Sequence, residues 1–249
     1  MSGPSHQERR LSFGATARQY DQFRPTYSRE GVRWLVDGAT REVREVADVG
    51  AGTGALTRVL LELGLSVCSI EPDEKMLHQL VASAPRATGV VGRAEALPLS
   101  DNSIDAVTVG QAWHWFEPAT AAREFTRVVR PGGVIGLLWN LRDDSEPWMA
   151  QLRAIVEGDD WEQHTPEDSI SSIAAVLPGV ELNRFEHAVA MSPEAVMGLV
   201  GTFSFVRLRE DADRIYAAVA TLLRTHPDTR DKTVIEVPYV TAVYRTLVP

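Results

Sequence analysis

The sequence predicts an α/β fold: a seven-stranded, mostly parallel sheet with helices on both faces and a last antiparallel strand. Three observations carry this prediction. From Glu45 onward, short β-branched or apolar runs alternate with longer helical segments, as in β-α-β units. Residues 134–139 are apolar throughout, as expected of a strand that is covered on both faces. Residues 234–247 alternate in polarity and predict a closing strand antiparallel to its neighbour.

The remaining elements rest on local patterns. The helix expected at 74–84 carries Met76, Leu77 and Leu80 on one side, and another begins at Ser192-Pro193, where proline suits a first helical turn. The strands are expected at 46–49, 66–70, 88–92, 104–110, 134–139, 181–191 and 234–247. The further helices are expected at 55–63, 118–129, 146–157 and 212–224. Residues 11–37 are expected to form an aromatic-rich helical lid, and residues 159–167 an irregular polar segment.

One domain accounts for the whole chain, because no repeat, low-complexity segment or linker divides it. Residues 1–249 are therefore expected to form a single unit. Within it we expect amino-terminal helices at 1–44, a cofactor-binding core at 45–139, and substrate-side helices with closing strands at 140–249.

The charge balance argues against polyanionic partners. With 25 basic against 34 acidic residues, the net charge is −9, which disfavours non-specific attraction to nucleic acid or to an anionic membrane. The single cysteine, Cys68, lacks an intramolecular partner, which suits a reducing compartment. The polar amino terminus has no signal-peptide pattern, and no window is long enough to span a membrane. We expect a cytoplasmic protein.

A glycine-rich loop is the strongest functional signal. Gly50, Gly52 and Gly54 follow the first expected strand and precede a helix. Glycine there lets the backbone turn sharply and a ligand approach closely, and the helix start presents unpaired N–H groups. Glu71, 21 positions after Gly50, ends the second strand in the manner of a ribose-binding acid. These features fit S-adenosylmethionine and a nicotinamide dinucleotide equally well.

Three further features favour S-adenosylmethionine. Asp48 stands before the loop, where it would repel the pyrophosphate of a dinucleotide but can help to hold a cationic amino-acid end. About twenty residues of expected helix precede the first strand, whereas dinucleotide domains often begin near theirs. The segment 92–98, followed by the turn at 101–105, is the third feature.

Together these motifs resemble the class I S-adenosylmethionine-dependent methyltransferases, particularly the type 11 small-molecule group. The resemblance covers about residues 45–139 and rests on Asp48-Val49-Gly50-Ala51-Gly52-Thr53-Gly54, Glu71-Pro72-Asp73, Ala94-Glu95-Ala96-Leu97-Pro98 and Val129-Arg130-Pro131-Gly132-Gly133. Tyr20-Asp21-Gln22-Phe23-Arg24-Pro25-Thr26-Tyr27 and His114-Trp115-Phe116 are similar to a subgroup that includes trans-aconitate methyltransferase-like proteins. The resemblance implies a Rossmann-like class I methyltransferase fold and S-adenosylmethionine as the cofactor.

The resemblance also implies roles for cofactor-site residues. The glycine loop would pass under the methionine part of the cofactor, and Glu71 would accept both ribose hydroxyls. Met76 would cover the adenine, Ala94 would offer it a backbone N–H, and Glu95 would accept from its exocyclic amine. Arg93 stands where many relatives carry an acid.

Two more residues would hold the amino-acid end. Gln111 would face the ammonium group, and Arg24 would pair with the carboxylate or with an acidic substrate; a structural ion pair is the alternative for Arg24. The expected cofactor-binding residues are Arg24, Asp48, Gly50, Gly52, Gly54, Glu71, Met76, Ala94, Glu95 and Gln111.

The substrate side is expected at the carboxyl edge of the sheet, where open α/β sheets hold ligands. Methyl transfer from a sulfonium requires in-line approach of a nucleophile, with a base only where the nucleophile begins protonated. His114 is the candidate base, and packing at the rim is its alternative role. The expected substrate-binding residues are Tyr20, Tyr27, Trp113, Trp115, Trp139 and Asn140. The other histidines show no spacing typical of a metal site.

The sequence therefore predicts a methyltransferase that acts on an oxygen, nitrogen or carboxylate of a small molecule, without nucleic-acid or membrane partners. Two alternatives remain: an NAD(P)-dependent oxidoreductase, and a non-catalytic S-adenosylmethionine-binding protein. Monomer and homodimer are both open.

Overall fold

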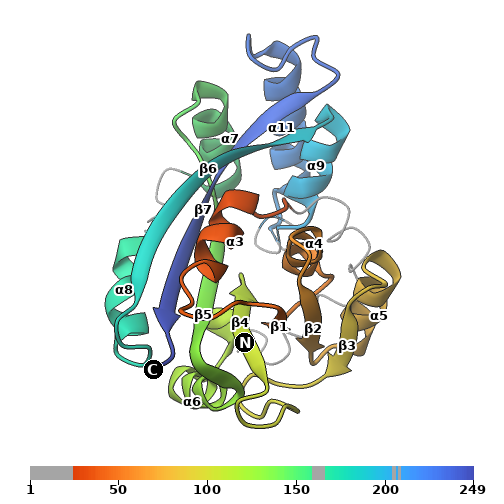
Figure 1. The fold of residues 1–249 in the computed structure, drawn as a ribbon. Coiled ribbons are helices and arrows are strands. Elements are labelled where there is room, and N and C mark those ends of the chain that lie inside the picture. The colour runs from red at the N-terminus through yellow and green to blue at the C-terminus, as the bar shows by residue number, and fades with distance from the viewer. Residues whose placement is uncertain (1–24, 159–165, 204–205, 207–208) are drawn as a thin grey trace.

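The computed structural model describes residues 25–158, 166–203, 206 and 209–249 (Figure 1). Within these residues, seven strands form one sheet in the order β3-β2-β1-β4-β5-β7-β6. β7, the last strand in sequence, runs antiparallel between β5 and β6, and the other strands share one direction. The predicted fold class, a mostly parallel sheet with a last antiparallel strand, is confirmed.

Most element boundaries lie within a few residues of those predicted. The strands are β1 Glu45–Val49, β2 Ser66–Glu71, β3 Thr88–Val91, β4 Ile104–Gly110, β5 Val129–Arg142, β6 Glu181–Met191 and β7 Ile235–Leu247. The helices are α3 Arg29–Val36, α4 Ala55–Glu62, α5 Glu74–Ser83, α6 Pro118–Val128, α7 Pro147–Glu157, α8 Pro166–Ala174, α9 Pro193–Gly201 and α11 Ala212–Thr225, with the short 3₁₀ helix η2 Trp113–Trp115.

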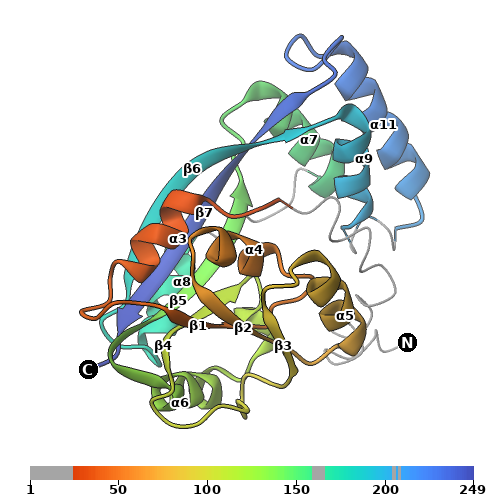
Figure 2. The same ribbon diagram turned by 45° about the vertical axis from the view of Figure 1, so that its right-hand side comes forward.

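Helices cover both faces of the sheet (Figure 2). α3 and α4 pack on one face, where Leu35 and Leu60 are fully buried. α6 and α8 pack on the opposite face around Phe125 and Ile173. Gly136 of β5 lets α3 approach closely, because a Cβ at this position would overlap the side chain of Leu35.

A separate hydrophobic core lies beyond the carboxyl end of β5. The pairing of β5 with β7 ends at Arg142 and Tyr239, whereas β6 and β7 stay paired as far as Met191 and Ile235. α7, α9 and α11 pack around this extension. We call these three helices and the paired strand ends the helical cap. In Figure 1 the cap stands at the top, past the ends of β4 and β5.

β5 is longer than the predicted strand at 134–139 because its first residues also pair with β4. The register shifts between them: Ile104 lies opposite Val129, but Ala106 lies opposite Val134. Gly132, with φ of 80°, and Gly133 lie inside this bulge. The two glycines therefore lie within the strand, where the register shifts.

Two segments differ from the prediction. Within the described part of 11–37, the helix begins only at Arg29, because Ser28 caps it by accepting a hydrogen bond from the Gly31 N–H at 3.2 Å. Residues 11–24, which are the first part of the predicted lid at 11–37, lie outside the described residues. Residues 166–167 were predicted to be irregular but begin α8, whose Ile173 is fully buried.

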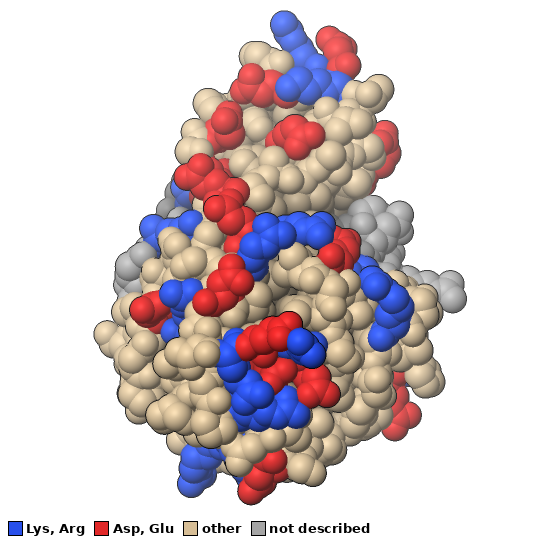
Figure 3. All heavy atoms as spheres, in the orientation of Figure 1, with Lys and Arg blue, Asp and Glu red and all other residues tan. Residues whose placement is uncertain are grey.

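The surface shows no segregation of charge on the face drawn in Figure 3, where acidic and basic side chains are interspersed. In the described part of the chain, no helix has the length and apolar character needed to cross a membrane.

Candidate cofactor and substrate site

The glycine loop joins the carboxyl end of β1 to α4. The N–H groups of Gly50 and Ala51 donate hydrogen bonds to the Ile70 carbonyl of β2, at 2.8 and 3.2 Å. Gly50, Gly52 and Gly54 adopt φ angles of 67°, 57° and 89°. These left-handed conformations favour glycine, so the loop conformation explains the glycine spacing.

The three glycines differ in what surrounds them. A Cβ at Gly50 would lie 2.7 Å from the Ala112 Cβ, and one at Gly54 would lie 2.8 Å from Leu80. A Cβ at Gly52 would meet nothing within 4 Å in the described structure. Packing therefore requires glycine at the first and third positions, while Gly52 leaves open space beside the backbone.

Glu71, at the end of β2, closes the loop. The side chain is buried, and its two oxygens accept hydrogen bonds from the N–H groups of Gly52 at 2.9 Å and Asp73 at 3.0 Å. Asp73 in turn caps α5. The contact of Glu71 with the ribose stays a prediction.

Asp48 lies beneath the loop and is fully buried. Its carboxylate accepts hydrogen bonds from the hydroxyls of Thr57 at 2.6 Å and Thr108 at 3.2 Å. Burial raises its pKa to about 6, against the opposing effect of these hydrogen bonds, and the nearby acid Glu71 adds to the rise. Sequence reasoning missed both threonines, although Thr108 is the polar residue within the otherwise apolar run 106–109.

The predicted adenine side gathers at the ends of β2 and β3. Met76 and Ala94 are buried. One oxygen of Glu95 accepts a hydrogen bond from the Glu117 N–H at 3.1 Å. Its other oxygen, Oε2, is buried without a hydrogen-bond partner among the described residues, although the Arg93 Nε lies 3.5 Å away. An acceptor in this state suits an amine donor such as that of adenine.

Gln111, just past β4, holds a strained backbone. Its φ is 58°, a conformation that costs a non-glycine residue about 1–2 kcal/mol and that clusters at functional sites. Its N–H donates to the Leu138 carbonyl and its side-chain Nε2 to the Asn140 carbonyl, each at 2.9 Å. The amide group thus binds β5, and its predicted contact with the ammonium stays a prediction.

Asn140, which is predicted to bind substrate, joins three segments of the structure. Its Nδ2 donates to the Thr26 carbonyl at 2.8 Å, and its Oδ1 accepts from the Thr241 hydroxyl at 2.6 Å. The His187 Nε2 lies 3.2 Å from the same Thr26 carbonyl. Both polar ends of Asn140 are therefore engaged in joining β5 to β7 and to the chain that leads into α3.

Among the described residues, the aromatic residues predicted to bind substrate pack in two different hydrophobic clusters. Tyr27 is buried over Gly110 on the side of α3, where a glycine Cβ would lie 2.6 Å from its hydroxyl. Trp139 packs edge-on against Tyr244 in the core of the opposite face. Trp113 is also buried in that core, and the predicted substrate contacts of these rings stay predictions.

The candidate base lies on η2. His114 is exposed, and its ring centroid lies 4.7 Å from that of the half-buried Trp115. Tyr20 and Arg24 lie outside the described residues. Among the residues that are described, no group of three or more His, Cys, Asp or Glu could hold a metal ion.

The mostly parallel sheet, its open glycine loop and the acid at the end of β2 are typical of α/β enzymes that bind a nucleotide-type cofactor at the carboxyl edge. Comparison with known proteins identifies the family. A model of a methyltransferase domain matches residues 47–137. An uncharacterized methyltransferase of Mycobacterium tuberculosis is 37% identical over 245 residues, which are 97% of each chain. Another, from Schizosaccharomyces pombe, is 29% identical over 94% of this chain and 95% of the relative.

A solved structure supports the same assignment. A protein of Anaeromyxobacter dehalogenans described as a type II methyltransferase superposes with a TM-score of 0.73 and 28% identity, covering 91% of this chain and 98% of that one. The chain belongs to the class I S-adenosylmethionine-dependent methyltransferases, and S-adenosylmethionine is its cofactor. The dinucleotide alternative is therefore wrong. The open side of Gly52, and the Glu95 oxygen that accepts no hydrogen bond from the described residues, fit this cofactor.

Proposed function

We propose that the enzyme methylates an oxygen, nitrogen or carboxylate of a small molecule held between the carboxyl edge of the sheet and the helical cap. The observation that carries the proposal is the position of the cap beyond the end of β5. The glycine loop opens at this same edge, where Gly52 leaves free space. A covered edge of this kind suits an acceptor small enough to be enclosed.

The main role of the residues around the cofactor would be to position the reactants. S-adenosylmethionine, when bound, supplies a methyl group on a sulfonium leaving group. Glu71 and Glu95 would orient the nucleoside part, and Gly52 would let the methionine part lie against the backbone. Fixing the methyl carbon in line with the acceptor removes much of the barrier.

A carboxylate acceptor has some support from a named relative. The malonyl-[acyl-carrier protein] O-methyltransferase of Methylococcus capsulatus is 38% identical over 136 residues, covering 49% of this chain and 48% of that enzyme. The match covers only about half of each protein, so it does not identify the acceptor. It is the reason to test carboxylic acids together with phenols and amines.

Calorimetry and product detection test the proposal. We expect S-adenosylmethionine and S-adenosylhomocysteine to bind and NAD not to bind. A panel of small carboxylic acids, phenols and amines, with a protein and an RNA as comparison acceptors, is then assayed for S-adenosylhomocysteine release. Turnover confined to the macromolecules would contradict the proposal.

His114 is the proposed base for an acceptor that begins protonated. His114→Ala should lower kcat by about 10²–10⁴-fold and leave S-adenosylhomocysteine affinity unchanged. His78→Ala is the matched control, because His78 is an exposed histidine on α5. Near-normal turnover of His114→Ala would remove His114 from the mechanism.

A further inference from the structure

The segment between β3 and β4 carries the two residues proposed to read adenine, Ala94 and Glu95. It makes few backbone hydrogen bonds of its own: the Ala96 N–H donates to the Arg93 carbonyl at 3.2 Å, in an isolated bridge between these two residues. Leu97, which follows, is buried but lies in no strand. Buried backbone N–H and C=O groups that are not paired in a sheet need other hydrogen-bond partners.

Two side chains of α6 supply those bonds. The Glu124 Oε2 accepts from the Leu97 N–H at 2.8 Å, and the Arg127 Nη2 donates to the Leu97 carbonyl at 3.2 Å. The Arg127 Nη1 donates to the Leu99 carbonyl at 2.8 Å. The backbone N–H and carbonyl of Leu97 are thus both hydrogen-bonded by one pair of side chains, as they would be by a neighbouring strand.

The pair is itself ordered. Nε and Nη2 of Arg127 bind the two oxygens of Glu124 at 2.8 and 2.7 Å, a bidentate geometry across one helical turn. Asp101 binds Nη1 at 2.8 Å from the outer side. Hydrogen bonding to Arg127 lowers the pKa of Glu124, which keeps the carboxylate ionised. Both side chains are therefore fixed before any ligand arrives.

We propose that Glu124 and Arg127 are positioning residues for adenine recognition. They hold the segment 94–97 so that the Ala94 backbone and the Glu95 carboxylate meet the base. The proposal rests on the proposed function, in which Glu95 orients the nucleoside, and on the adenine contact that the family resemblance implies for Ala94. It adds that cofactor selectivity is set from α6, by a pair that does not touch the cofactor.

The alternative is that the pair stabilises the fold without any effect on base selection. The two roles differ in what they do to ligands that lack parts of adenine. A purely structural role weakens all ligands alike through loss of folded protein. A positioning role weakens ligands that carry the base, and it weakens the adenosyl compound most because that compound also loses the amine contact with Glu95.

Binding of three ligands separates these roles. They are S-adenosylhomocysteine, S-inosylhomocysteine, in which an oxygen replaces the exocyclic amine, and S-ribosylhomocysteine, which lacks the base. The wild-type enzyme should prefer the adenosyl over the inosyl compound by about tenfold or more, the value of one buried hydrogen bond. Arg127→Gln should reduce this preference to about twofold, with affinity for the ribosyl compound unchanged.

Matched variants complete the experiment. Arg123→Gln is the control, since Arg123 is exposed on the same helix and binds the Thr120 hydroxyl. Arg127→Lys keeps the positive charge but loses the bidentate guanidinium geometry, so it should give an intermediate preference. It also provides the measurement if Arg127→Gln does not fold. Unchanged preference in both Arg127 variants, or equal loss for all three ligands, would overturn the proposal. Failure of the wild-type enzyme to bind S-adenosylhomocysteine would instead overturn the proposed function.

Discussion

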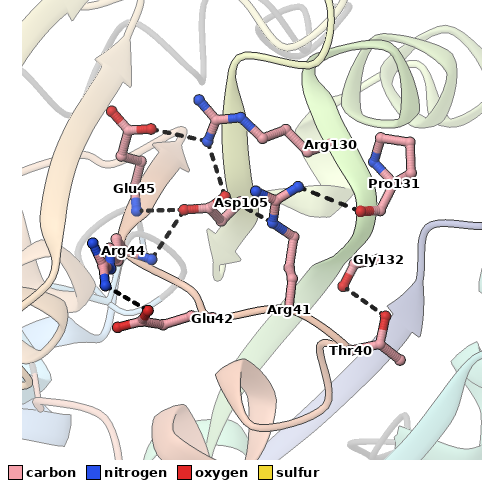
Figure 4. Close-up of polar contacts among 9 residues, drawn as sticks. All are labelled: Thr40, Arg41, Glu42, Arg44, Glu45, Asp105, Arg130, Pro131 and Gly132. Carbon is pink, nitrogen blue, oxygen red and sulfur yellow. Dashed lines mark hydrogen bonds and ion pairs between the residues drawn. The ribbon is translucent and has the colours of Figure 1, made fainter.

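Two buried aspartates on neighbouring strands show how differently the two edges of the sheet are built. Asp105 lies near the amino end of β4, and Asp48 near the carboxyl end of β1; their exposed fractions are 3% and 0%. Asp105 is surrounded by partners (Figure 4). Arg130 and Arg41 bind one oxygen at 2.9 and 3.1 Å, and the N–H groups of residues 44 and 45 donate to the other, each at 3.0 Å.

The partners of Asp48 are neutral hydroxyls, from Thr57 and Thr108. The pKa values consequently move in opposite directions. Burial alone raises the pKa of Asp105, but the N–H donors and Arg130 together bring it below its ordinary value. Burial raises the pKa of Asp48 to about 6. The charge of Asp105 is balanced by partners within the chain. A cationic ligand such as S-adenosylmethionine would help to balance the charge of Asp48 at the carboxyl edge.

The largest expected effect follows from removing Asp105. Asp105→Ala leaves two arginines and two backbone N–H groups without their acceptor, so the free energy of unfolding should fall by about 3 kcal/mol. Urea unfolding measures this loss. Glu42→Ala is the control: its ion pair with Arg44 at 2.6 Å is exposed, and its removal should have no measurable effect. Weakened S-adenosylhomocysteine binding in folded Asp105→Ala would show that the two edges are not independent.

The pH dependence of stability should have opposite signs at the two sites. Asp48 has a folded pKa near 6 against an ordinary 3.8, so its contribution is greatest below the ordinary value. That contribution, about 3 kcal/mol, is lost as the pH rises through 6. Asp105 has a lowered folded pKa, so its contribution is present above its ordinary pKa and is lost as the pH falls through the folded value.

Isosteric variants isolate these contributions. As the pH rises, the stability of Asp48→Asn relative to the wild-type enzyme should increase between about pH 4 and pH 6, whereas the relative stability of Asp105→Asn should decrease through the acid range. Urea unfolding at several pH values gives both slopes. Slopes of the same sign in the two variants would contradict the assigned difference between the edges.

The fold was largely predictable because its signals are local. The strand at 104–110 and the strand at 181–191 have the predicted bounds, since apolar runs and turn residues delimit them. The bulge at 130–133 was not predictable, because it depends on pairing with β4, a neighbour distant in sequence. The start of α3 was misjudged: the prediction placed residues 25–28 in a helix, whereas Ser28 caps a helix that begins at Arg29.

The site was predictable only where the backbone defines it. Gly50, Gly52 and Gly54 require left-handed conformations that the spacing indicates. Side-chain partners were not predictable: the Asn140 amide binds Thr26 and Thr241, which are remote in sequence. Nor does sequence pattern show that Glu124 and Arg127 face a distant loop rather than solvent.

The smallest expected effect on stability gives a sharp test of the carboxyl edge. Gly52 and Gly64 both have positive φ, 57° and 85°, and a Cβ at either would meet nothing within 4 Å in the described structure. Gly64 lies at the amino edge, between α4 and β2. Alanine at either position should therefore cost a similar 1–2 kcal/mol, roughly, in backbone strain.

Cofactor affinity should distinguish Gly52→Ala from Gly64→Ala. Gly52→Ala puts a methyl group where the cofactor is proposed to lie, so the Kd for S-adenosylhomocysteine should rise by about 10–100-fold, the range expected for overpacking. Gly64→Ala should bind like the wild-type enzyme, because its methyl group lies at the opposite edge. Calorimetry on both folded variants measures the difference. Equal affinities would mean that the open space beside Gly52 is solvent rather than the cofactor's place, and the contrast between the two edges would then rest on Asp48 alone.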